Sequence, residues 1–282
     1  MPKDETTPIA PSPSAHTIDT GTPELLCSIE DGVAEVTLHR PDARNALTMD
    51  MKLALWDLLP ALDSNPDARC LLLTGSGTAF CSGGDTKRMK SEGKPPSLED
   101  RRRQLRWEHD IPRNLHELGI PTVAALTGPA AGAGLGLALA CDIRLAARSA
   151  FITTAYARLG LAGDYGVAWF LTQLAGPARA RELFFTARRV DAEECERLGL
   201  VNSIHEDDEL REAAREMART IASGPPVAHR FMKENLNRAC RESLATCLDF
   251  EADRMVRGAT TEDYLEAVSA FAEKRKPVFQ GR

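Results

Sequence analysis

Apolar and uncharged residues fill one long stretch of the chain: no charged residue occurs from Ile120 to Cys141. About 20 apolar residues are enough to cross a bilayer, but this stretch is mostly Ala and Gly, Pro129 interrupts it, and Lys or Arg does not flank it as in a membrane span. The pattern instead predicts a short buried strand at residues 122–126, a Gly/Pro turn at 127–131 and a buried helix from about Gly132.

Regular patterns elsewhere predict the other elements of the first 207 residues. Alternation of apolar and polar residues and short continuous apolar runs indicate strands, and apolar residues at helical spacing indicate a helix that Thr48 caps. A strand followed by a glycine-rich loop occurs twice, at residues 70–85 and 122–136, and such repeated units favour an α/β layered fold. The predicted strands are residues 25–29, 33–38, 70–74, 122–126, 143–146 and 151–153.

The pattern becomes purely helical after residue 207. Apolar residues recur there at helical spacing, and no strand pattern interrupts them. We therefore predict three successive helices, at residues 209–223, 227–257 and 261–274, which together form a helical C-terminal module at residues 208–282.

The start of the chain has a different composition. Residues 1–20 are rich in Pro, Thr and Ser and contain no apolar core of a signal peptide. Such a segment cannot bury enough apolar surface to fold. We therefore predict a disordered N-terminal tail at residues 1–20, followed by an α/β core at 21–207.

Composition and charge narrow the class of protein. The chain has 282 residues, of which 43% are hydrophobic and 27% charged, as in an ordinary globular protein. A net charge of −6 argues against general nucleic-acid binding. The seven Cys include no C-x-x-C pair and the six His lie apart, so we predict no disulfide framework, no metal site and a cytoplasmic location. We interpret the basic cluster as a solvated helix face, although it can also meet a phosphate-bearing ligand; it consists of Arg101, Arg102, Arg103 and Arg106.

Two glycine-rich loops offer backbone N–H groups to a ligand. The first, at residues 75–85, lacks the Lys-Ser/Thr of a P-loop, and Phe80 stands where a nucleophile elbow around Ser82 needs Gly. The second opens the predicted helix near Gly132, where N–H groups and the helix dipole favour an anion. It lacks the third Gly or Ala of a dinucleotide-binding fingerprint. The two loops therefore indicate backbone anion sites. The alternative is that their glycines serve only close packing.

Motifs in and around these loops resemble the enoyl-CoA hydratase/isomerase superfamily, the crotonases, over nearly everything after residue 25. The resemblance implies a spiral of ββα repeats, a helical C-terminal part that packs between subunits, and a homotrimer or dimer of trimers. It also implies an acyl-CoA thioester substrate, no separate cofactor, and no nucleic-acid or membrane partner. The matching segments are Arg40-Pro41 with Asn45-Ala46-Leu47, residues 75–85, residues 128–134 with Ala140-Cys141-Asp142, Arg158-Leu159-Gly160-Leu161, Gly199-Leu200-Val201-Asn202 and Ala270-Phe271-Ala272-Glu273-Lys274-Arg275.

The same resemblance assigns the two loops to an oxyanion hole, with the amides of Ser82 and Ala133 as its donors. Preorganised donors stabilise an enolate more than the substrate, and one such donor is typically worth about 2.7–4 kcal/mol. Phe271 and Lys274 would reach the CoA from a neighbouring subunit, although Lys274 is equally an exposed lysine at a helix end. The residues expected along the CoA and thioester path are Arg44, Ala46, Ser82, Gly83, Gly84, Asp85, Thr86, Gly132, Gly136 and Tyr156.

The chain departs from the hydratases of this superfamily at both of their catalytic glutamates. The two positions hold Gly136 and Tyr156, and water addition needs both a base and an acid. Asp164, in a Gly-Leu-x-x-Asp-x-Gly pattern, matches the aspartate of several isomerases, in which one carboxylate suffices to move a double bond. We therefore predict an enoyl-CoA isomerase with Asp164 as proton shuttle and, because Gly136 is small, a roomy pocket.

Three alternatives stay open. Asp164 can be an ordinary N-cap of the helix that starts near Val167, since Asp is among the best N-cap residues. The protein can be a hydratase in which Asp164 works alone or with Tyr156. It can also be a non-catalytic acyl-CoA-binding subunit that keeps the two loops.

Overall fold

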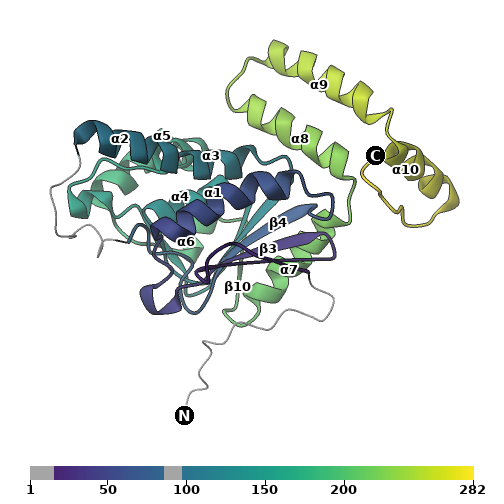
Figure 1. Cartoon of the computed structure of the whole chain (residues 1–282). Coiled ribbons are helices and arrows are strands. Elements are labelled where there is room, and N and C mark those ends of the chain that lie inside the picture. Colours follow the sequence, from purple (N-terminus) through teal and green to yellow (C-terminus); the bar gives the residue numbers. More distant parts are fainter. Residues whose placement is uncertain (1–15, 86–96) are drawn as a thin grey trace.

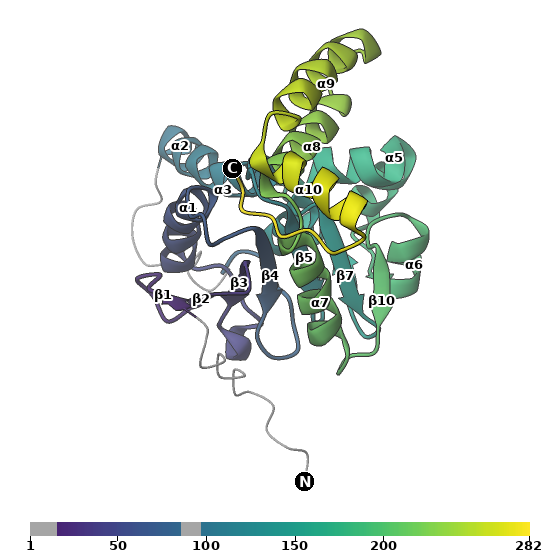
Figure 2. The same ribbon diagram turned by 90° about the vertical axis from the view of Figure 1, so that its right-hand side faces the viewer.

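The computed structural model describes residues 16–85 and 97–282, and a mainly parallel sheet forms its core (Figures 1 and 2). Within these residues the sheet has seven strands in the order β1-β2-β3-β4-β5-β7-β10. The β1–β2 and β2–β3 pairs are antiparallel, and the remaining pairs are parallel. The strands are β1 (His16–Ile18), β2 (Leu25–Glu30), β3 (Val33–Leu38), β4 (Cys70–Gly75), β5 (Thr122–Leu126), β7 (Ile143–Ala147) and β10 (Ser203–His205).

A smaller sheet lies beside the start of α4 and contains β6 (Ala130–Ala131), β8 (Phe151–Thr153) and β9 (Val190–Asp191). β8 is its central strand, parallel to β6 and antiparallel to β9. Strands and helices alternate along the chain as far as β10, which confirms the predicted α/β class. The helices are η1 (Pro41–Ala43), α1 (Met49–Asp63), α2 (Leu98–Glu108), α3 (Asp110–Glu117), α4 (Ala133–Ala140), η3 (Tyr156–Leu159), α5 (Val167–Thr186), α6 (Ala192–Arg197), α7 (Leu210–Ala222), α8 (Pro226–Ala239), α9 (Leu244–Gly258) and α10 (Glu262–Glu273).

Helices cover both faces of the main sheet, which explains why its central strands are apolar throughout. Every residue of β4 and β5 is buried, as expected for parallel strands between two layers. α7 packs across β3, β4, β5 and β7, and α1, α3 and α4 lie on the opposite side (Figure 1). After β10 the described chain is purely helical, as predicted, but α7 packs on the sheet, so the helices that stand apart from the sheet begin at α8. None of the helices in the described part combines the length and apolar composition needed to cross a bilayer.

Two further predictions are corrected by the backbone. β1 pairs with β2, so the predicted disorder of residues 1–20 is wrong for His16–Ile18, while residues 1–15 lie outside the described part. The predicted helix at 227–257 is two helices, α8 and α9, separated at residues 240–243. Ser243 is the N-cap of α9: its hydroxyl accepts a hydrogen bond from the Thr246 amide at 3.3 Å.

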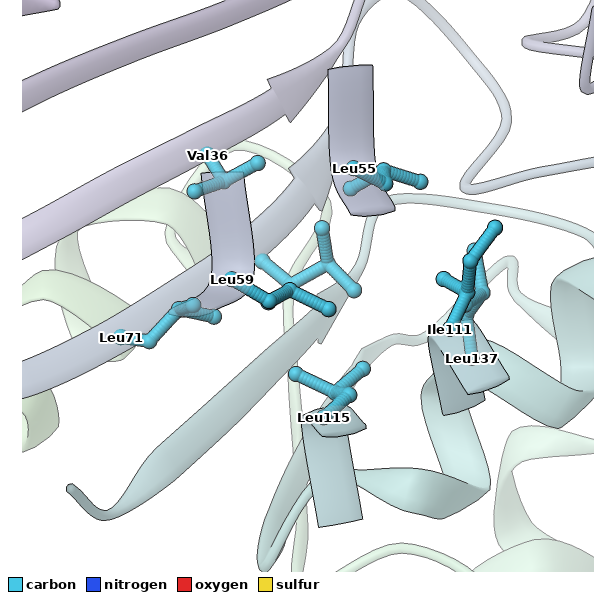
Figure 3. A pocket seen from close by; sticks show the side chains of 8 residues that line it. Val36, Leu55, Leu59, Leu71, Ile111, Leu115 and Leu137 are labelled. Carbon is cyan, nitrogen blue, oxygen red and sulfur yellow. The ribbon is translucent and has the colours of Figure 1, made fainter. Parts of the chain in front are cut away.

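A small apolar cavity of about 10 Å³ lies between the sheet and the helices α1, α3 and α4 (Figure 3). Only aliphatic side chains line it, so it offers a water molecule no hydrogen-bonding partner. The lining residues are Val36, Leu55, Leu59, Leu71, Leu73, Ile111, Leu115 and Leu137.

Truncating one of these side chains should destabilise the fold. We expect Leu59→Ala to lower the free energy of unfolding by about 2–5 kcal/mol, because it removes apolar contacts and enlarges the cavity. Unfolding in urea measures the change. The matched control is Leu53→Ala on the same helix, where the side chain is 46% exposed; its cost should stay near about 0.5 kcal/mol. Equal losses in the two variants would contradict the prediction.

Candidate active site

The two glycine loops lie side by side and are joined through their backbones. Cys81 N–H donates to Pro129 O at 3.2 Å, and Ala131 N–H donates to Cys81 O at 2.9 Å. Gly83 approaches the second loop so closely that a Cβ on it would lie 3.0 Å from Ala131 O. Its φ of 98° also favours Gly. The structure thus brings together the two stretches in which the sequence predicted backbone anion sites.

A buried asparagine and an arginine hold the first loop in place. Asn45 is fully buried, and its Nδ2 donates to backbone carbonyl oxygens of the loop, including that of Ser76 at 2.9 Å. Arg40 Nη1 donates to Ala46 O at 2.7 Å and forms an ion pair with Asp85 at 3.2 Å. Arg40 and Asn45 belong to the family motif quoted above, but the motif does not indicate that they hold the loop in place. The available signal was Asn in a turn, since Asn tolerates the left-handed backbone that Asn45 adopts, with a φ of 55°.

The Ser82 amide, predicted as an oxyanion donor, is already bonded within the protein. It donates to Arg44 O at 2.9 Å. Facing a thioester oxygen would require breaking this bond, and an internal acceptor left without its donor is costly. The assignment of Ser82 as a donor is therefore wrong for this geometry.

Gly84 supplies the amide that the first loop leaves unbonded. The neighbouring Asp85 N–H donates to Leu47 O at 3.2 Å. Leu47 and Gly84 form a parallel bridge, in which the flanking residues make the hydrogen bonds and the Gly84 N–H points away from Leu47. Among residues 16–85 and 97–282, no group accepts a hydrogen bond from this amide.

Ala133 is the first residue of α4 and follows Gly132, whose φ is 51°. Across the described residues its amide has no acceptor, and the first amides of a helix carry the positive end of its dipole. Ala133 N lies 3.7 Å from the position that a Cβ on Gly83 would take. The two unbonded amides, those of Gly84 and Ala133, therefore border the same region. The predicted role of Ala133 fits this geometry and stays a prediction.

Asp164 lies in the loop between η3 and α5, and its carboxylate accepts a hydrogen bond from Tyr156 Oη at 2.7 Å. α5 begins at Val167 with Gly166 as its N-cap and without a side-chain capping bond. The alternative in which Asp164 is an ordinary N-cap is therefore wrong. The Tyr156 ring lies 3.8 Å from the position of a Cβ on Gly132, which places the Tyr156–Asp164 pair beside the start of α4.

Gly136 does not leave a roomy pocket, so that prediction is wrong. A Cβ on Gly136 would lie 2.6 Å from Tyr165 Cβ and 2.7 Å from Tyr165 O. Tyr165 is 1% exposed and has a φ of 52°, an unusual backbone conformation for a bulky residue. The next residue after Asp164 thus occupies the space of the missing side chain. A glutamate at position 136 would require the loop that carries Asp164 to move.

Other predicted residues lie apart from this region or have a different character. Phe271 is 88% exposed on α10, and Lys274 ends that helix; α10 stands well to the side of α4 in Figure 1. Thr86 lies outside the described residues.

Burial raises the pKa of the Cys81 thiol to about 12, so this thiol is not a nucleophile near neutral pH. In the described part, no group of three or more His, Cys, Asp or Glu is placed to hold a metal ion. The exposed arginines of α2 are Arg101, Arg102, Arg103 and Arg106.

Comparison with known proteins identifies the family of this chain. A model of the enoyl-CoA hydratase/isomerase family matches residues 28–282. The chain is 36% identical over 258 residues to 1,2-epoxyphenylacetyl-CoA isomerase of Escherichia coli K12. The matched region covers 92% of this chain and 98% of that relative. It is also 35% identical over 253 residues to the short-chain-enoyl-CoA hydratase of Clostridium acetobutylicum. This match covers 89% of this chain and 95% of the hydratase.

A solved structure shows the same fold. The enoyl-CoA hydratase from Polaromonas sp. JS666 superposes with a TM-score of 0.86 at 32% identity, over 90% of this chain and 99% of that one. The similarity includes the α/β core and the helical C-terminal region, as the coverage of both chains requires. The protein therefore belongs to the enoyl-CoA hydratase/isomerase family and has the crotonase fold.

Proposed function

We propose that this protein is an enoyl-CoA isomerase that moves a double bond of an acyl-CoA thioester, with Asp164 as proton shuttle. The observation that carries the proposal is the place of the carboxylate. Asp164 borders the start of α4 through its neighbours Tyr156 and Tyr165, whereas position 136 holds Gly and position 156 holds Tyr. A single positioned carboxylate is enough to remove a proton from one carbon and return it to another.

The chain's own residues account for each step. Asp164 takes a proton from an acyl carbon, and the C–H electron pair moves into the conjugated system, so that the thioester oxygen becomes an enolate oxygen. The N–H groups of Gly84 and Ala133 donate to that oxygen and stabilise the enolate more than the substrate. Asp164 then returns the proton to the carbon two bonds away, which forms the new C–H bond and restores the thioester carbonyl.

The names of relatives support the reaction class and supply a second candidate. One relative is named an isomerase and another, almost as similar, a hydratase. Hydration needs one group to activate water and another to protonate carbon. Gly136 and Tyr156 provide no carboxylate for this, so we place isomerisation first and hydration second.

We also propose that CoA extends along the first loop and that a neighbouring copy completes its site. Phe271 and Lys274 would reach the CoA from that copy in a homotrimer or dimer of trimers. Large apolar side chains exposed on α8, α9 and α10 support assembly, among them Leu236 at 69%, Leu244 at 75% and Met255 at 73% exposed. CoA is part of the substrate, and we propose no separate cofactor. The residues placed along the CoA and thioester are Arg44, Ala46, Ser82, Gly83, Gly84, Asp85 and Gly132.

Mass spectrometry of linear and cyclic enoyl-CoAs, incubated with the protein in deuterated water, tests the proposed reaction. We expect migration of the double bond with no water adduct, and deuterium uptake in the acyl chain only to the extent that the proton on Asp164 exchanges with solvent before it is returned. A water adduct would establish hydration instead. Acyl-CoA binding with neither migration nor deuterium uptake would favour a non-catalytic binding subunit.

A further inference from the structure

Tyr156 contacts Asp164 through its hydroxyl, whose shorter hydrogen bond is to the carboxylate, and its ring is packed on neighbouring residues. Its hydroxyl lies 2.7 Å from Asp164 Oδ1 and 3.2 Å from Asp164 O. The ring is 5% exposed and stacks on Phe184, with ring centroids 5.8 Å apart and an angle of 19° between the ring planes. Gly132 lies beside the ring, since a Cβ there would be 3.8 Å from Tyr156 Cε1. A donor fixed in this way restricts rotation of the carboxylate it bonds.

The tyrosine acts as donor rather than acceptor. Burial, together with the nearby Asp164 carboxylate, raises the pKa of Tyr156 above its usual value. The phenol therefore keeps its proton near neutral pH and donates it in a charge-assisted hydrogen bond to the carboxylate. In the described part of the chain, Tyr156 donates to Oδ1 and to the backbone oxygen of Asp164, and no group donates to the second carboxylate oxygen, Oδ2.

We propose that Tyr156 is a positioning residue that holds Asp164 Oδ1, so that Oδ2 is the single atom that takes the proton and returns it. This inference rests on the proposed isomerase function. A shuttle must serve two carbons in succession from one side of the acyl chain, and a carboxylate that rotates between the steps presents its proton in the wrong direction. A fixed carboxylate instead keeps the acquired proton near both carbons, where a small misplacement is enough to slow the reaction greatly.

The residue that stands in place of a hydratase glutamate thus has a different use in this chain. The sequence places Tyr156 along the substrate path or as a partner in hydration. Its hydroxyl is instead committed to Asp164.

Tyr156→Phe tests the proposal, because it removes only the hydroxyl and keeps the stacked ring. With an enoyl-CoA that the wild-type enzyme isomerises, we expect kcat to fall about 10–100-fold. KM and the Kd of a non-reactive acyl-CoA thioether should not change, since a positioning role acts after binding. In deuterated water, the fraction of product molecules that carry solvent deuterium should rise, because a carboxylate free to rotate exchanges its proton before returning it.

Tyr165→Phe is the matched control: the same substitution, one residue beyond Asp164, at a buried hydroxyl that has no partner in the described part. We expect wild-type kcat and a wild-type deuterium fraction in this variant. Three results in Tyr156→Phe would overturn the proposal: unchanged kcat and deuterium fraction, a change confined to KM and Kd, or a loss of rate that follows a loss of thermal stability with the deuterium fraction unchanged. A wild-type enzyme that isomerises no enoyl-CoA would instead remove the proposed function itself.

Discussion

Replacing Asp164 with Asn should lower the rate of isomerisation by about 10²–10⁴-fold, the usual effect of losing a positioned general base. Asn has nearly the same shape, and its side-chain oxygen still accepts the Tyr156 hydrogen bond, but it cannot take a proton. Binding of a non-reactive acyl-CoA thioether should be kept, because the amides of Gly84 and Ala133 are untouched. The measurements are kcat for a convertible enoyl-CoA and Kd for the thioether.

The control for this variant is Asp67→Asn, the same change at an exposed aspartate between α1 and β4. It should leave both quantities unchanged, since isolated surface substitutions have small effects. Near-normal turnover in Asp164→Asn would show that another group moves the proton. The proposal of a single-aspartate shuttle would then have to be abandoned.

Ala133→Pro should reduce kcat by about 10²–10³-fold, because it deletes one of the two N–H donors to the enolate oxygen. Proline has no backbone N–H, and it is well accepted at the first position of a helix, where that N–H has no intrahelical partner. Ala133 holds this position in α4. The substitution therefore removes the donor without interrupting a helical hydrogen bond.

Ala133→Gly is the matched variant, since it also changes the side chain but keeps the amide. We expect its kcat to remain close to that of the wild type, and both variants to bind the acyl-CoA thioether. Circular dichroism and thermal unfolding verify that α4 and the fold are kept. Equal activity of the Pro and Gly variants would mean that the Ala133 amide does not stabilise the transition state.

Sequence by itself determined the elements whose cause is local. The uncharged run after Ile120 is too long for one strand and broken by a Gly/Pro turn, and it forms β5 and α4 at the predicted places, while the end of the predicted turn pairs as the short strand β6. Period-two alternation likewise located β2 and β3. The motifs established the family, and the residue types at positions 136 and 156 excluded two glutamates. Each of these inferences depends only on residue identity and spacing within a short segment.

Tertiary structure alone decided which groups are available at the site. Whether an amide is free depends on acceptors that are distant in sequence: Arg44 O engages Ser82, while Gly84 stays unbonded. The space at Gly136 is filled by Tyr165, from a loop 29 residues later in the chain. A pattern within one segment carries no information about such contacts, because they form only when the layers pack. For the same reason, the hydrogen bond from Tyr156 that directs Asp164 was visible only in the folded chain.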